Sequence, residues 1–380
     1  MKKIFTSLLI MLMMVIGQIF PVSALSYDES FALAKNYFES VSSIQSIDEI
    51  IASEALGVDT HQKAIPVELI ETDAASKVAK TIIALTLHGD DPRNYNGTNY
   101  VELLESAIRE DGSVYFDSEK NSFGSNNQIY CVYALYIVNS TKLELAADYL
   151  ASMIQEDGAF TYAGGYKDLD VTGWAVEALS LVNKTKYQST IEKAISFIQS
   201  YQKEDASFDM YGYGANVNTQ ACVLAGLLTY DSEGVKAGKY NQNDSNPYDV
   251  LLSFQNTDGS FWSTFNGEGK YDSYATMQAA QTVGYYVNGS VYEKARQKYL
   301  ALGEVVQPET KPEESIADSQ DKNDEEVNKV ETNEVKTETV KETSKKADVV
   351  QTDDISWLTG YGLLFLGSGI LLLKGRKYFE

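Results

Sequence analysis

The sequence of 380 residues has few of the side chains on which enzyme and metal chemistry most often depend. It contains two cysteines and two histidines. Cys131 and Cys222 lie in separate apolar segments without a Cys-x-x-Cys motif or metal-type spacing, so we expect buried free thiols. His61 and His88 both precede most of the domain. They support neither a zinc site nor a Ser/His/Asp constellation, and we predict no metal and no cofactor.

Basic residues are also scarce. The chain has 31 Lys and Arg against 54 Asp and Glu, which gives a net charge of −23 and a pI of about 4.5. Proteins that bind nucleic acid need patches of Lys and Arg to meet the phosphates, so we do not expect a nucleic-acid partner. We attribute the acidity to the solubility of a surface protein.

One short turn recurs along the chain. It reads Glu-Asp-Gly at 110–112 and 156–158, Glu-Asp-Ala at 204–206 and Thr-Asp-Gly at 257–259. The turns follow one another at intervals of roughly 50 residues, and no strand pattern accompanies them. Such a period predicts helical hairpins that stack side by side.

Each repeat combines two kinds of helix. Residues 170–182 are apolar on nearly all sides, with Glu177 as the one charge after Asp170, which predicts a helix buried all round. Residues 189–201 form one apolar stripe and therefore an outer helix. The same pairing predicts inner and outer helices at 126–138 with 142–154, 216–229 with 247–256, 273–287 with 291–301, and 74–88 with 98–109.

Helices near 27–43 and 45–56 bring the expected total to twelve. Six buried helices ringed by six amphipathic ones predict an all-α fold, a closed α/α toroid (an α6/α6 barrel of helical hairpins) over residues 25–303.

Several of the turns carry further residues in common. Gln155-x-x-Gly158-x-Phe160, Gln202 with Phe208, and the segment 255–262 resemble the QW-type repeat of terpenoid cyclases and prenyltransferases. The segment 168–175 resembles the start of an inner helix in that superfamily. The resemblance covers about residues 70–300 and implies the toroid. The superfamily includes squalene cyclases, protein prenyltransferase β subunits, thioester domains and cobalamin carriers, so the fold alone does not set the activity.

Asp168 and Asp170 are weak catalytic candidates. Class II terpene cyclases use Asp-x-Asp-Asp, whose middle Asp protonates an alkene, but here Val171 stands at the last position. The simpler interpretation is that Asp170 is the N-cap of the inner helix, because an Asp side chain accepts hydrogen bonds from the free N–H groups there.

Loops rich in Tyr and Gly follow the turns, at 160–166, 208–216 and 262–274. The resemblance places the superfamily's ligand sites where such loops and the N-termini of the inner helices converge. Tyr offers a flat apolar face with a polar tip. We therefore predict a mouth that binds a small polar or glycan-like ligand, although these Tyr rings could simply pack the loops. The predicted lining is Tyr162, Tyr166, Trp174, Tyr211, Tyr213, Asn218, Trp262, Tyr271 and Asp272.

The two ends of the chain predict export and anchoring. Residues 1–24 have the basic start, apolar run and small-residue cleavage site of a signal peptide. Residues 304–355 contain 16 acidic and 7 basic side chains and no aromatic residue, which predicts a disordered stalk. Residues 356–373 are apolar and long enough to span a membrane, and the basic tail 374–380 would lie in the cytoplasm.

The segment 350–354 resembles a Gram-positive sortase signal, with Thr-Asp where Thr-Gly is usual. Membrane anchoring and attachment to the cell wall both follow from these features. We therefore expect a protein on the outer face of a Gram-positive cell. Its function is expected to be non-catalytic ligand binding. The alternatives are an extracellular enzyme of the terpenoid cyclase-like or glycan-degrading type, and a cobalamin carrier-like or adhesive module.

Overall fold

The structure is a computed structural model that describes residues 25–118 and 124–304. The predicted signal peptide, membrane helix and tail lie outside the described residues, as does the predicted stalk beyond Glu304. The described part contains twelve α-helices, the short 3-10 helices η1 (Val67–Leu69) and η2 (Ala163–Gly165), and a hairpin of β1 (Phe160–Thr161) and β2 (Lys167–Asp168). No helix within it is both long and apolar enough to cross a membrane.

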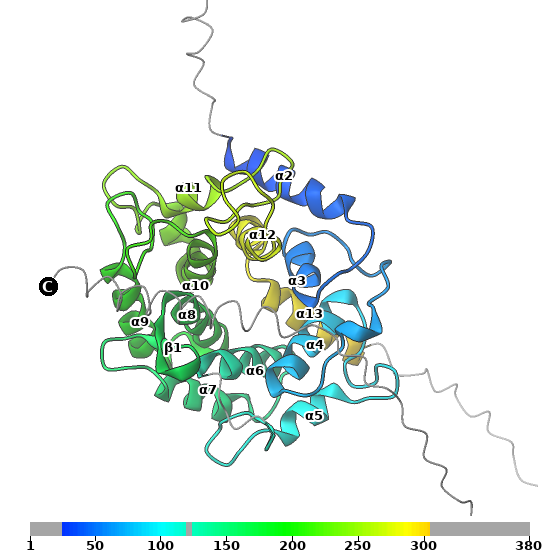
Figure 1. The fold of residues 1–380 in the computed structure, drawn as a ribbon. Helices are drawn as coiled ribbons and strands as arrows, with labels where there is room; N and C mark the ends of the chain where they lie inside the picture. The colour runs from blue at the N-terminus through cyan, green and yellow to red at the C-terminus, as the bar shows by residue number, and fades with distance from the viewer. Residues whose placement is uncertain (1–24, 119–123, 305–380) are drawn as a thin grey trace, which may run out of the picture. The chain divides into compact units, whose positions relative to one another are not determined.

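Six helices form an inner ring around the axis of the toroid (Figure 1). Each packs against the next, and the last packs against the first, so the ring is closed. Its small and branched apolar side chains are almost all buried, which confirms the predicted helical toroid. The inner helices are α3 (Ile47–Ala55), α4 (Ala75–His88), α6 (Ser125–Ile137), α8 (Leu169–Asn183), α10 (Val217–Lys236) and α12 (Ser273–Asn288).

Neighbouring inner helices run parallel, as contacts at their two ends show. The Ser46 hydroxyl, at the start of α3, lies 3.1 Å from the Met277 sulfur near the start of α12. At the other end, Asn288 of α12 donates a hydrogen bond to the carbonyl of Ala55 in α3. Pairs in the same parallel register join four of the other five neighbouring pairs of helices: Asp48 with Lys80, Lys80 with Tyr130, Tyr133 with Glu177, and Asn218 with Gln278.

Five amphipathic helices cover the outside of the ring. They are α2 (Tyr27–Ser40), α5 (Tyr100–Ser106), α7 (Leu143–Ser152), α9 (Gln188–Ser200) and α11 (Pro247–Leu252). Four of them pack on the inner helix that precedes them in the chain, whereas α2 packs on α12. The first helix of the domain therefore fills the outer position beside the last inner helix.

The recurring turns hold each repeat against its neighbour. In three of them the Asp carboxylate accepts hydrogen bonds from the backbone N–H and the hydroxyl of the Ser two residues later. Gly259 has φ +91°, and a Cβ atom there would lie 2.1 Å from the carbonyl oxygen of Leu33 in α2. Gln255 donates to the carbonyl of Ser30 in the same helix at 2.9 Å. The last turn thus closes the ring onto the first helix.

Helix α13 (Val291–Glu304) differs from the prediction, because residues 291–301 do not form a sixth outer helix. Instead α13 packs against α3, α4, α6 and α12 of the inner ring. Carbonyl groups in the last turn of a helix lack partners within that helix and carry partial negative charge. The basic side chains of α13 donate hydrogen bonds to carbonyls at the ends of three inner helices: Lys294 to Glu54, Lys298 to Leu87, and Arg296 to Tyr136. This end of the ring is closed, and the N-termini of the inner helices lie at the other end.

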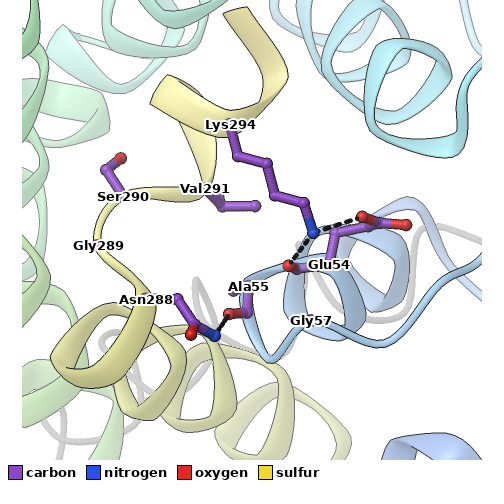
Figure 2. Close-up of a pocket in the computed structure, with 8 residues that line it drawn as sticks. All are labelled: Glu54, Ala55, Gly57, Asn288, Gly289, Ser290, Val291 and Lys294. Carbon is purple, nitrogen blue, oxygen red and sulfur yellow. Dashed lines mark hydrogen bonds and ion pairs between the residues drawn. The ribbon is translucent and has the colours of Figure 1, made fainter. Parts of the chain in front are cut away.

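Glu54 fixes α13 in place (Figure 2). Its buried carboxylate lies 2.9 Å from Nζ of Lys294, as Figure 2 shows. It also lies 3.0 Å from Nζ of Lys298 and accepts a hydrogen bond from Thr60. Burial alone would raise the pKa of Glu54, but the two lysines outweigh burial and lower it. A cavity of about 260 Å³ lies beside this ion pair, lined by the α12–α13 turn and the end of α3.

We expect that replacing Lys294 and Lys298 together with Met lowers the free energy of unfolding by about 3–5 kcal/mol, because the buried carboxylate of Glu54 would lose both cations. Lys270→Met is the matched control on an exposed loop. Urea unfolding of the three proteins measures the difference. Equal midpoints for the double variant and the control would contradict this account of α13.

We also expect Gly226→Ala to destabilise the toroid by about 2 kcal/mol or more, because α8 and α10 approach too closely for a side chain. A Cβ atom at Gly226 would lie 2.3 Å from the carbonyl oxygen of Gly173. Gly303→Ala is the control, since a Cβ there meets nothing within 4 Å. The prediction fails if thermal unfolding shows the two variants to be equally stable.

Candidate functional site

Polar and aromatic side chains from all six inner helices gather around the axis. Each of these side chains is half-buried, although most positions of the inner helices are fully buried. We call this set the axial cluster. Its members are Asp48 on α3, Lys80 on α4, Tyr130 on α6, Asp170 and Trp174 on α8, Asn218 and Thr219 on α10, and Gln278 on α12.

Contacts run through the axial cluster from helix to helix. Nζ of Lys80 lies 3.1 Å from a carboxylate oxygen of Asp48 and 4.6 Å from the ring centre of Tyr130. The Tyr130 ring lies 5.9 Å from the Trp174 ring. Burial would lower the pKa of Lys80, but the charge of Asp48 raises it above its ordinary value, so the amine stays charged. The cluster therefore offers a fixed cation beside two aromatic faces.

On the other side of the cluster the groups are amides and a carboxyl. Nδ2 of Asn218 donates to Oε1 of Gln278 at 2.6 Å. Asp170 of α8 forms a side-chain hydrogen bond with Thr219 of α10. Behind them, burial raises the pKa of the Cys222 thiol, and the charges of Asp170, Asp168 and Glu177 raise it further. Cys222 thus stays a neutral thiol.

The interpretation of Asp170 as the N-cap of its helix is wrong. The cap of α8 is Asp168, whose Oδ1 accepts a hydrogen bond from the N–H of Val171 at 2.9 Å. Asp170 is the second residue of the helix, where its carboxyl turns toward α10. Burial raises the pKa of Asp170 to about 8, and the neighbouring charge of Asp168 contributes to the rise. At neutral pH the Asp170 carboxyl is therefore mostly protonated and can donate a hydrogen bond.

Glu177 lies deeper in the ring, toward α13. It is fully buried and accepts a hydrogen bond from the Tyr133 hydroxyl at 3.0 Å, while the hydroxyl of Ser290 lies 3.4 Å away. The Tyr133 ring stacks on Tyr292 of α13 with centres 4.0 Å apart. Burial raises the pKa of Glu177 to about 7. These residues form a closed polar floor below the axial cluster.

The structure distributes the predicted mouth residues over three settings. Trp174 and Asn218 belong to the axial cluster. Tyr166, Tyr211, Tyr213 and Tyr271 are exposed on loops that lead into the inner helices. Tyr211 donates its hydroxyl hydrogen to the carbonyl of Lys167 at 2.9 Å, which joins two of these loops.

The remaining predicted residues hold the loops. Tyr162 is half-buried against the core, and the Trp262 ring packs 4.6 Å from the Phe254 ring. Asp272 is the N-cap of α12, where it accepts a hydrogen bond from the N–H of Ala275. It also accepts hydrogen bonds from Ser263 and Asn266 across its loop.

The described residues show no group of three His, Cys, Asp or Glu side chains that could hold a metal ion. Cys131 and Cys222 are buried thiols that are not joined in a disulfide, as predicted. The His61 and His88 rings lie 5.5 Å apart, and His88 bonds to Asp90 and to the carbonyl of Lys63, so both rings serve the fold near the end of α4.

Sequence reasoning missed Asp48, Lys80, Tyr130 and Gln278. Each is a polar or aromatic residue in a helix that the apolar pattern identifies as buried. A charged residue in such a helix is a usable signal, because it must be paired or must face a solvent-filled space. Glu177 is such a charged residue in an apolar helix, but the sequence alone does not indicate its role.

Comparison with known proteins gives the following. The family model for the prenyltransferase alpha-alpha toroid domain matches the chain twice, over residues 35–168 and 166–300. No curated protein sequence matches.

Similar solved structures include the ent-copalyl diphosphate synthase from Streptomyces platensis, with 14% identity, a TM-score of 0.42, and coverage of 70% of this chain and 50% of that one. The type II terpene cyclase MstE from Scytonema, in an apo variant, shares 13% identity with a TM-score of 0.40 over 71% of this chain and 87% of that one. This chain therefore spans half the length of the synthase.

The raised pKa of Glu177 predicts how the stability of the protein depends on pH. Its pKa rises from 4.5 in the unfolded chain to about 7 in the fold, so the stabilising effect is complete below pH 4.5 and is lost as the pH rises through 7. The loss is on the order of 3 kcal/mol. We expect Glu177→Gln to remove this part of the pH dependence. Urea unfolding at pH 5 and pH 8 measures it, with Glu110→Gln at an exposed position as the control. A Glu177→Gln protein that loses as much stability as the parent between these pH values would refute the assignment.

Proposed function

The chain belongs to the prenyltransferase alpha-alpha toroid domain family, and on this premise we propose that its toroid binds a small polar or glycan-like ligand without catalysis at the axial cluster. The observation that carries the proposal is the cluster itself. Each of the six inner helices contributes a half-buried polar or aromatic side chain to it, while the fully buried positions of these helices are mostly apolar.

The cost in desolvation free energy of burying these polar side chains supports a binding role. A partly buried ion pair such as Asp48 with Lys80 contributes little to folding, because desolvation offsets the attraction, and apolar residues of similar size often serve a core as well or better. The same reasoning applies to the amides of Asn218 and Gln278. Groups that the fold does not need, gathered at one place, favour a ligand site.

The chemistry of the cluster fits a polyhydroxylated ring. Trp174 and Tyr130 offer flat apolar faces, and the charged amine of Lys80 beside them can donate hydrogen bonds. Asn218 and Gln278 supply amide donors and acceptors, and the protonated carboxyl of Asp170 supplies one more donor. A few polar groups at fixed positions among aromatic faces are typical of sites for small polar ligands.

The proposed setting is the outer face of a Gram-positive cell. It rests on the predicted signal peptide and on the predicted C-terminal anchor, with the membrane or a sortase as the partner of that anchor. An exported protein would meet sugars and other polar molecules from its surroundings.

A second candidate function is acid catalysis of the terpenoid cyclase-like type. Asp170 favours it, because a carboxyl with a pKa of about 8 is protonated at neutral pH and can act as a general acid. Trp174 lies one turn further along α8 and could stabilise a cation formed next to that acid. The position of the adjoining carboxylate in the cyclase motif is occupied by Val171.

Two variants, Trp174→Ala and Asp170→Asn, distinguish ligand binding from acid catalysis. Native mass spectrometry of the full-length protein identifies the bound small molecule. We expect Trp174→Ala to weaken the binding of that molecule by about tenfold or more. One aromatic contact supplies ~1 kcal/mol of binding free energy, and the gap left by the missing ring removes further contacts with the ligand. Leu145→Ala, on an exposed position of α7, is the control. If no small molecule is found on the protein, or if Trp174→Ala retains it fully, the binding proposal fails.

Asp170→Asn tests whether the Asp170 carboxyl acts as a catalytic acid. Under the binding proposal this variant keeps its ligand and its melting temperature, since Asp168 rather than Asp170 caps the helix. Incubation with squalene, followed by gas chromatography, tests for cyclised products. Cyclised products from the parent protein that disappear with Asp170→Asn would establish catalysis in place of simple binding.

A further inference from the structure

The exposed aromatic residues of this protein are not scattered. In the described part of the chain every aromatic ring that is exposed lies in one of three segments, 163–167, 208–216 and 263–274. Tyr213 is 81% exposed and Tyr166 is 69% exposed. Rings as exposed as these two gain little free energy from folding, because most of their surface stays in water. The six rings are Tyr166, Tyr211, Tyr213, Phe265, Tyr271 and Tyr274, and we call them the aromatic arc.

The aromatic arc lies along one side of the ring's N-terminal end. Its three segments lead into α8, α10 and α12, which are consecutive helices of the inner ring. The segment before α4 carries Glu71 and Asp73, which pair with Lys77 in the first turn of α4. Neither this segment nor the one before α3 carries an exposed aromatic ring. Since packed helices lie ~8–10 Å apart, an arc across three of them extends over roughly 20 Å. That length exceeds a single sugar ring and suits a chain of several.

The loop 208–216, which carries two rings of the aromatic arc, is held in shape by hydrogen bonds. The carboxylate of Asp209 accepts hydrogen bonds from four successive backbone N–H groups, those of residues 211 to 214, at 2.7 to 3.1 Å. These bonds outweigh burial and lower the pKa of Asp209. The Tyr211 and Tyr213 rings are thereby fixed with centres 6.3 Å apart. A rigid loop that holds exposed rings is preorganised for binding.

We propose that the aromatic arc is an outer subsite that binds successive rings of a neutral oligosaccharide chain, one end of which reaches the axial cluster. The proposal rests on the proposed function and names its ligand as a polymer. Sugar rings have an apolar face that stacks on aromatic rings and hydroxyls that reach the polar tips of Tyr. The chain's net charge of −23 disfavours polyanionic glycans and anionic membranes.

The test uses the full-length protein and four defined probes: the dimer and the hexamer of β-1,4-linked N-acetylglucosamine, and the dimer and the hexamer of β-1,4-linked glucose. Isothermal titration should show that at least one hexamer binds at least tenfold more tightly than its dimer. Replacing Tyr211 and Tyr213 together with Ala should weaken that hexamer at least tenfold and leave the dimer unchanged. Tyr213→Phe, which keeps the ring, and Leu145→Ala should bind as the parent does.

Three outcomes would overturn the inference: no hexamer binds, hexamer and dimer bind equally, or the Tyr211/Tyr213 variant loses binding to phosphatidylcholine vesicles rather than to a hexamer. The result also separates this inference from the proposed function. If neither sugar binds but Trp174→Ala still removes the small molecule found by mass spectrometry, the axial site stands and the arc fails. If a hexamer binds through the arc but Trp174→Ala fully retains the small molecule found by mass spectrometry, the arc stands and the axial site fails.

Discussion

The parallel arrangement of the inner helices is the constraint from which the rest of this structure follows. Parallel helices place their unpaired carbonyls, and the negative ends of their dipoles, at one end of the ring. There α13 supplies Lys294, Arg296 and Lys298, and Glu54 holds two of these side chains in place. The opposite end needs acceptors instead, and Asp168, Asn216 and Asp272 supply them as caps. One end is therefore closed by cations, and the loops of the other end are left for binding.

This polarity also arranges the groups along the axis. Glu177 and Tyr133 form a floor that is closed to water by α13, and Asp170, Lys80 and Trp174 lie above it, where the helices begin. The two buried carboxyls differ in setting. Glu177 lies among Tyr hydroxyls, whereas Asp170 lies next to a second carboxylate and reaches across to Thr219. Of the two, only Asp170 faces the axial cluster, where a protonated carboxyl can donate a hydrogen bond to a ligand oxygen.

Sequence patterns predicted the ring well and the site only in part. All six inner helices and five outer ones follow from apolar periodicity, because burial on all sides leaves a nearly uniform apolar segment. Helix α13 has the same amphipathic pattern as an outer helix, and nothing local reveals that its basic residues meet carbonyls more than 150 residues away. Trp174 and Asn218 could be placed because they follow recurring turns, whereas Asp48 and Lys80 depend on pairing between helices that only the folded ring brings together. The distinction between Asp168 and Asp170 as the cap was a matter of two positions and required backbone geometry.

The contact of Gly259 with Leu33, described above as the closure of the ring, sets a limit on how this protein can assemble and evolve. In an open stack of hairpins a repeat can be added or removed, since each unit touches only its neighbours. Here the hairpins can form from local contacts, but the joint between α12 and α2 links residues more than 220 positions apart and can form only when every unit between them is in place. Long-range pairing of this kind slows folding. It also fixes the number of repeats, because one hairpin more or fewer would leave Gly259 and the backbone of α2 unable to meet.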